Sequence, residues 1–146
     1  MKNDRSSAMA FGRADVDRSA KALLDFLERN SREELFAFPF SYSFPKNACE
    51  STSLILTYLL EEKYQLDDVA IIKGSKVSGY DNHFWVVAGG LTYDLTAHQF
   101  PGLKPVIGSL PDPMHHAYDE WSVEHRREFV DRDEVVELYR AGVIPF

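Results

Sequence analysis

The chain has only one cysteine, Cys49, among its 146 residues. A single cysteine cannot form an internal disulfide, so nothing in the sequence points to an oxidising compartment. No uninterrupted apolar run approaches the ~18 residues that a membrane span requires, and the first residues lack the apolar core of a signal peptide. These absences predict a cytoplasmic protein without a membrane segment.

Basic residues are also scarce, since 16 Lys and Arg face 23 Asp and Glu, and the formal net charge is −7. Without a Lys/Arg cluster, the chain has no basic face for a nucleic-acid backbone or for an acidic membrane surface. We therefore expect neither nucleic acid nor membrane as a partner.

Motifs for metals and cofactors are missing as well. The chain has no second cysteine and no His-x₃-His or His-Glu-x-x-His spacing, and it has no Gly-rich phosphate loop. We expect no cofactor and no metal. His115 and His116 are expected to lie exposed in a polar loop, and His98 and His125 receive no role.

What the chain does contain is apolar and aromatic side chains, at 45% and 13% of its residues. This composition is typical of a packed protein, and the length fits one domain with a substantial core. We expect a flexible tail over residues 1–14 and a single domain over residues 15–146.

Apolar periodicity and turn residues predict an α+β fold. In chain order, the expected elements are an amphipathic helix over 15–30, a capped helical turn at 31–34, a buried helix from Asn47 to about Lys63, a strand over 69–73, a hairpin over 84–96, a loop-like stretch over 101–113, and a last helix that is capped by Asp131 and Glu134 and ended by Gly142.

Aromatic residues alternate along residues 36–44, with Pro39 inside the stretch and Pro45 directly after it. The alternation predicts an extended segment with one aromatic face, which the proline confines to a sheet edge or a loop. The simplest interpretation is an aromatic strap over the core. The functional alternative is a wall of a substrate cleft.

A Gly-Gly pair at positions 89 and 90 predicts a two-residue hairpin turn. With this turn, Trp85 opposes Asp94 and His83 opposes Thr96. Opposed residues share a face of the sheet, and so do residues two apart on one strand. The register therefore makes His83 and Asp94 diagonal neighbours within reach of a hydrogen bond.

Cys49 lies at the start of the predicted buried helix. Asn47 is the expected N-cap, with Glu50 completing a capping-box-like pair, so Cys49 becomes the second helical residue. Unpaired backbone N–H groups and the helix dipole favour a thiolate at this position, and the Glu50 carboxylate opposes it slightly. The same N–H groups are candidates for holding an oxyanion.

A thiol, an imidazole and a carboxylate are the parts of a thiol nucleophile, its general base and the group that orients the base. Cys49, His83 and Asp94 supply these parts in chain order. A lone intracellular cysteine is more often an inert small hydrophobe, and a histidine at a strand start is more often structural. An aspartate within an apolar strand is costly to bury unless it is paired, and this favours the catalytic interpretation.

The segment His83-Phe-Trp-Val86 resembles the His-x-Trp-Val strand of bacterial transglutaminase-like proteins, which include the leader peptidases of lasso-peptide maturation, and Asp94-Leu-Thr96 is similar to their Asp-x-Thr. The resemblance to this papain-like and transglutaminase-like superfamily covers roughly residues 45–100. It implies a papain-like or transglutaminase-like core, in which N-terminal helices precede a central helix that bears the nucleophile and packs on a small antiparallel sheet. It also implies that Cys49 is the nucleophile, His83 the base and Asp94 the orienting group.

The chain departs from the papain-like pattern in one respect, because residues 41–48 contain no glutamine to serve as oxyanion donor. Asn47, Tyr42 and Trp85 are the candidates for oxyanion or substrate contacts, although Asn47 is equally well used as the cap. The donor is therefore left open.

The sequence thus predicts a cysteine-dependent hydrolase of amide bonds that acts on a peptide or protein substrate through an acyl-enzyme. Water on a peptide bond makes it a peptidase, water on a glutamine side chain makes it a deamidase, and an amine in place of water makes it a transferase. The alternative is a non-catalytic protein-binding module that keeps the fold and uses residues 36–44 as its contact surface. The sequence identifies no accessory protein.

Overall fold

The computed structural model describes residues 11–31, 38–39, 41–77 and 82–146. These residues form an α+β fold, as predicted, with four α-helices and a five-stranded antiparallel sheet. The helices are α2 (Arg13–Arg29), α3 (Cys49–Tyr64), α4 (Pro113–His116) and α5 (Arg132–Arg140), and the strands are β1 (Ala70–Ser75), β2 (Asn82–Ala88), β3 (Leu91–Asp94), β4 (Val106–Ser109) and β5 (Glu120–Glu124).

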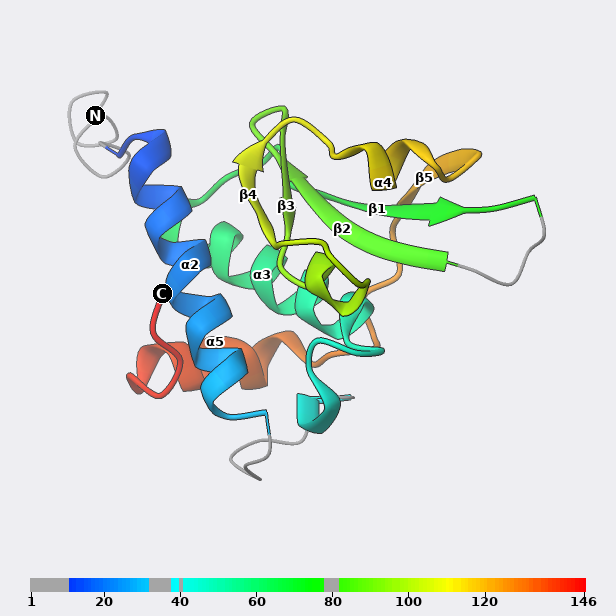
Figure 1. The fold of residues 1–146 in the computed structure, drawn as a ribbon. Coiled ribbons are helices and arrows are strands. Elements are labelled where there is room, and N and C mark those ends of the chain that lie inside the picture. The colour runs from blue at the N-terminus through cyan, green and yellow to red at the C-terminus, as the bar shows by residue number, and fades with distance from the viewer. Residues whose placement is uncertain (1–10, 32–37, 40, 78–81) are drawn as a thin grey trace.

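The strands lie in the order β4-β3-β2-β1-β5, so the hairpin strands β2 and β3 are flanked on both sides. Helix α3 packs against β1 and β2 and lies between the sheet and α5, while α2 packs against α3 and β4 (Figure 1). The core therefore forms between the sheet and the helices, with α3 at its centre.

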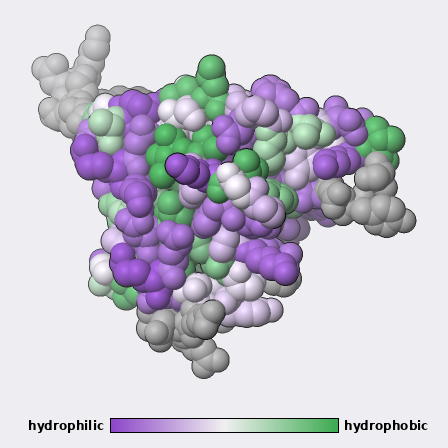
Figure 2. All heavy atoms as spheres, viewed as in Figure 1, coloured by the Kyte–Doolittle hydropathy of each residue, from purple (hydrophilic) through white to green (hydrophobic). Residues whose placement is uncertain are grey.

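The long helices follow from their apolar patterns. Helix α2 buries one face, and hydrophilic residues cover most of its outer side (Figure 2). Helix α3 buries every side chain from Ser51 to Leu60, with Leu59 and Leu60 fully inaccessible, as expected for the central helix. Helix α2 begins at Arg13, inside the expected tail 1–14, because Gly12 serves as its N-cap. Among the described helices, none combines the length and apolar character needed to cross a bilayer.

The predicted hairpin register is confirmed. Val86 pairs with Tyr93 and Ala88 with Leu91, and both turn glycines, 89 and 90, have positive φ values of 59° and 78°. Positive φ at both central residues defines the turn that matches the twist of a hairpin, and glycine adopts it without steric cost. Strand β3 ends at Asp94, two residues earlier than predicted.

The C-terminal helix α5 is also as predicted at both ends. The Asp131 carboxylate accepts a hydrogen bond from the Glu134 backbone N–H at 3.1 Å, which satisfies one of the unpaired donors of the first turn. Gly142 follows the helix with a φ of 79°, the left-handed conformation that commonly ends helices.

Residues 101–124 differ from the prediction. The stretch 101–113 was expected to be loop-like, but it contains β4, and α4 and β5 follow it. Both strands are short edge strands with one neighbour each, and β5 is largely exposed. An edge strand needs little apolar alternation, so the sequence carries only a weak signal for it.

Residues 41–43 also differ, because they form the 3₁₀ turn η1 (Ser41–Ser43) rather than an extended strand. Phe38 and Phe44 are buried, whereas Tyr42 is 69% exposed. The two described phenylalanines therefore behave as core residues. The rest of the aromatic pattern, Phe36 and Phe40, and residues 32–34 of the helical turn expected at 31–34 lie outside the described residues.

Gly74 of β1 occupies a position where a side chain does not fit. A Cβ there would lie 2.8 Å from ring atoms of Trp85 and of Tyr118. We expect Gly74→Ala to lower the free energy of unfolding by about 1–3 kcal/mol through overpacking, measured by urea denaturation. Ser75→Ala on the same strand is the control, and an unchanged free energy in Gly74→Ala would contradict the close packing.

Candidate functional site

Cys49 is the first residue of α3, and its N-cap is Ala48. The prediction that Asn47 caps the helix and that Cys49 is its second residue is wrong by one position. Asn47 instead adopts a φ of 62°, a left-handed conformation that asparagine tolerates better than most residues. Cys49 still lies in the first turn, where backbone N–H groups lack intrahelical acceptors.

The predicted capping box at this helix is likewise absent, since α3 has no side-chain cap hydrogen bond. Glu50 is partly buried beside Cys49. Burial raises the pKa of the Glu50 carboxyl, and the nearby Glu124 carboxylate raises it further.

His83 and Asp94 meet as the hairpin register predicts. His83 Nε2 lies 2.7 Å from Asp94 Oδ2, and both side chains are buried, with 0% and 1% exposure. His83 belongs to β2 and Asp94 is the last residue of β3, so the turn between the two strands sets their spacing. The pair is therefore part of the sheet and is shielded from solvent.

The Cys49 thiol interacts with the His83 imidazole. Burial works to lower the pKa of His83, but the hydrogen bond to Asp94 and the interaction with Cys49 outweigh it and raise the pKa to about 9. His83 Nδ1 is buried and has no hydrogen-bond partner of ordinary geometry among the described residues. The second ring nitrogen is therefore available to the thiol, and the structure brings together the three residues that the sequence singled out.

The Asp94 carboxylate is held by both of its oxygens. Oδ2 accepts from His83, and Oδ1 lies 3.2 Å from the Thr96 backbone nitrogen and 3.4 Å from the Thr96 hydroxyl. Burial acts to raise the pKa of Asp94, but hydrogen bonds from His115 and His83 outweigh it and lower the pKa to about 2. Asp94 is thus ionised at neutral pH despite its burial.

His115 is the residue that the sequence interpretation placed wrongly. It was expected in an exposed loop, yet its side chain is fully buried and its Nε2 lies 2.8 Å from Asp94 Oδ2. Its neighbour His116 is exposed, as predicted. The two adjacent histidines differ because α4 turns only one of them toward the sheet, which no local pattern indicates.

Aromatic rings pack on the two buried histidines of the site, His83 and His115. Phe100 meets the His83 ring edge-on at 5.1 Å between centroids, and Trp85 packs against His115 at 4.5 Å. Trp85 is fully buried, with an indole N–H that has no partner among the described residues. It therefore lies within the wall of the site rather than on a surface open to substrate.

The other two candidates for oxyanion contacts occupy the loop before α3. Tyr42 is exposed in η1, and the Asn47 backbone N–H lies 3.4 Å from Oε1 of Gln99. Gln99 Nε2 in turn lies 3.4 Å from the Thr96 hydroxyl. Gln99, which the sequence did not single out, thus connects the loop before Cys49 to the residue that holds Asp94.

The side chains of His83, Asp94 and His115 are of the kinds that bind metals, and one ligand atom from each lies within 4.8 Å of the others. Both histidine Nε2 atoms, however, are at hydrogen-bond distance from the same carboxylate oxygen. A zinc ion binds histidine nitrogen at ~2.0–2.1 Å. It would therefore take the place of the proton in each of the two hydrogen bonds and would break both of them. The arrangement is that of a hydrogen-bonded network.

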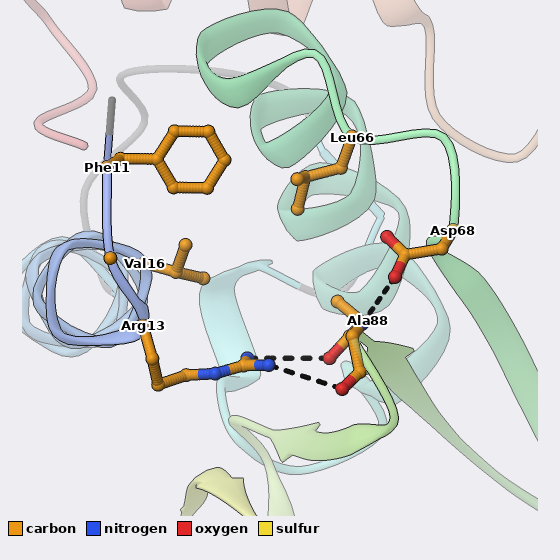
Figure 3. A pocket seen from close by; sticks show the side chains of 8 residues that line it. Phe11, Arg13, Val16, Leu66, Asp68 and Ala88 are labelled. Carbon is orange, nitrogen blue, oxygen red and sulfur yellow. Dashed lines mark hydrogen bonds between the residues drawn. The ribbon is translucent and has the colours of Figure 1, made fainter. Parts of the chain in front are cut away.

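The described residues also line hollows on the surface. One of about 170 Å³ opens between the start of α2 and the hairpin turn (Figure 3). Its charged groups already bind the chain itself, since Arg13 donates to the Ala88 and Gly89 carbonyls and Asp68 accepts from the Gly89 N–H. A second hollow, of about 230 Å³, is lined by Glu50, Arg126, Glu128 and Phe129 and includes the residue next to Cys49.

Comparisons of the chain with protein-family models, with curated proteins and with solved structures found no significant match.

Proposed function

We propose that the protein is a cysteine-dependent hydrolase of amide bonds with a papain-like or transglutaminase-like core. Cys49 is the nucleophile, His83 the general base and acid, and Asp94 the group that orients His83. The observation that carries this proposal is the buried His83 ring, which bonds to Asp94 through Nε2 and interacts with the Cys49 thiol. A thiol, an imidazole and a carboxylate in this order are the working parts of a thiol nucleophile.

His83 takes the proton of Cys49 as general base and becomes an imidazolium. The thiolate attacks the substrate carbonyl carbon, and the carbonyl oxygen becomes an oxyanion beside the first N–H groups of α3. When the C–N bond breaks, His83 gives its Nδ1 proton to the leaving nitrogen, which leaves a thioester on Cys49. His83 then takes a proton from water, the hydroxide attacks the thioester, and thiolate and imidazolium are restored.

Asp94 contributes by accepting the His83 Nε2–H throughout this cycle. It keeps the Nδ1 side of the ring turned toward Cys49 and stabilises the imidazolium charge. A half-buried thiol at a helix start, next to a protonated imidazole, is the environment in which cysteines become reactive.

The substrate is a peptide or protein amide. Hydrolysis is the default reaction, because water needs no second binding site, and release of ammonia from a glutamine side chain uses the same steps as release of an amine from a peptide bond. Transfer to an amine differs only in the second nucleophile. Product analysis therefore decides among peptidase, deamidase and transferase.

The test of the proposal is acylation of Cys49 by p-nitrophenyl acetate, together with iodoacetamide labelling across pH. We expect a burst of one p-nitrophenolate per chain, an acetyl group mapped to Cys49, and labelling well below pH ~7. A thiol that labels only near pH ~8.5, like free cysteine, contradicts the proposal and favours a non-catalytic binding module. Once acylation is established, peptide libraries assayed for cleavage, ammonia release and amine incorporation identify the reaction.

His83 is expected to titrate near pH 9, so that its imidazole is protonated at neutral pH and loses its charge only above that value. The measurement is the ¹⁵N shift of the His83 ring against pH. Cys49→Ala should lower the midpoint, because one of the two favourable partners is lost, and Asp94→Asn should lower it further. A midpoint near 6.5 in the unmodified protein would contradict the proposed ion pair.

A further inference from the structure

We propose that His115 is a positioning residue of this site, which holds the Asp94 carboxylate in place for His83 by donating its Nε2–H to Asp94 Oδ2. The inference deepens the proposed function and rests on it for its catalytic meaning. His115 belongs to α4, in the part of the chain where no regular structure was expected. It makes the site a four-residue network rather than a triad.

The hydrogen bonds of His115 determine its protonation. Its Nδ1 lies 3.0 Å from the Asp112 backbone nitrogen, which donates its N–H to it. A ring nitrogen that accepts a hydrogen bond carries no proton, so the proton of the neutral ring is on Nε2. His115 Nε2 therefore donates to Asp94 Oδ2 at 2.8 Å. His115 acts as a neutral donor, while His83 is the ring that carries the charge.

The surroundings of His115 fix its ring as firmly as its hydrogen bonds do. The Trp121 indole N–H donates to the His115 backbone carbonyl at 2.9 Å, and the Trp85 ring packs on the imidazole. With 0% exposure, the ring cannot turn to water. The segment from α4 to β5 thus presents one rigid N–H donor to the carboxylate.

Two donors on one oxygen limit how Asp94 can move. If His115 were lost, Oδ2 would keep only His83, and Oδ1 would keep the two longer contacts to Thr96. A buried carboxylate with fewer donors is less stable as an anion, so it takes up a proton at higher pH. A protonated or rotated Asp94 no longer holds the His83 ring toward Cys49.

The test compares His115→Phe, which keeps a flat ring without nitrogens, with His115→Gln, whose amide N–H can reach the place of Nε2. His116→Phe is the matched control, since the same change is made at the exposed neighbour. The first readout is the pH titration of the Asp94 carboxyl carbon by ¹³C NMR. We expect an upward shift of about one pKa unit or more in His115→Phe, little shift in His115→Gln, and none in His116→Phe.

The second readout is the rate constant of Cys49 acetylation by p-nitrophenyl acetate at pH 6. We expect a fall of about tenfold in His115→Phe and recovery in His115→Gln. An unchanged Asp94 titration with an unchanged acetylation rate would overturn the proposal and leave His115 with a packing role only. If His115→Phe does not fold, His115→Asn replaces it, because its shorter amide cannot reach Asp94 while that of His115→Gln can.

The two proposals fail in different ways. If the unmodified protein shows no activated thiol but His115→Phe shifts the Asp94 titration, the hydrolase is wrong and the positioning of Asp94 stands. If the thiol is activated and neither readout changes in His115→Phe, the hydrolase stands and the role of His115 is wrong.

Discussion

Replacing Cys49 by alanine is expected to reduce acylation by more than about a thousandfold while the protein stays folded. The chain contains no other thiol that could act as the nucleophile. The proposed roles of His83 and Asp94 are to activate the thiol, and neither residue replaces it. The thiol is only partly buried at the start of α3, so its loss should change the free energy of unfolding by less than about 1 kcal/mol. Burst kinetics and urea denaturation measure the two quantities.

Ser109→Ala, an exposed position on the edge strand β4, is the control for handling and folding. A large loss of stability in Cys49→Ala would show that the cysteine is a core residue. Acetylation that persists in Cys49→Ala at the original rate would place the nucleophile elsewhere.

Replacing Asp94 by alanine should have the largest effect on stability. It leaves two buried imidazole N–H groups, those of His83 and His115, without an acceptor. Removing one partner of a buried charged pair costs about 3–5 kcal/mol. We expect a loss of that order in urea denaturation at pH 7, and acetylation of Cys49 should fall with it.

The sign of the pH dependence provides a second test. The pKa of Asp94 is lowered to about 2 in the folded protein, below its value of ~3.9 in an unfolded chain. Its stabilising contribution is therefore complete above pH ~4 and is lost as the pH falls toward 2. The difference in stability between the unmodified protein and Asp94→Ala should shrink over that range.

Asp25→Asn is the matched control for Asp94, because Asp25 is an exposed carboxylate paired with Lys21 on α2. Such surface pairs contribute little, and the expected change is within about 0.5 kcal/mol. A loss in Asp94→Ala as small as that in Asp25→Asn would contradict the buried network.

Local patterns were sufficient for the elements whose signals are short-range. The two turn glycines determine how β2 and β3 pair, and the pairing puts His83 and Asp94 on one face. Asp131 and Gly142 mark the ends of α5 through the unpaired backbone groups of a helix. These features were predicted because each depends on residues close together in the sequence.

Other features depend on contacts between distant segments. Asn47 has the composition of a cap but takes a left-handed conformation beside Gln99, and the cap passes to Ala48. The edge strand β4 carries little apolar alternation of its own and exists because β3 offers it a partner. A single sequence does not show which distant segment provides such a contact.

The site around Cys49 combines features that are set by the local sequence with features that are set by contacts between distant segments. The place of Cys49 in the first turn of a buried helix, and the pairing of His83 with Asp94, follow from helix periodicity and from a two-residue turn, which are local properties of the sequence. The closeness of Cys49 to His83, and the burial of His115 against Asp94, come only with the packing of α3 and α4 against the sheet. A buried carboxylate is costly unless hydrogen-bond donors surround it, and only the tertiary structure brings the donors of His83, Thr96 and His115 to Asp94.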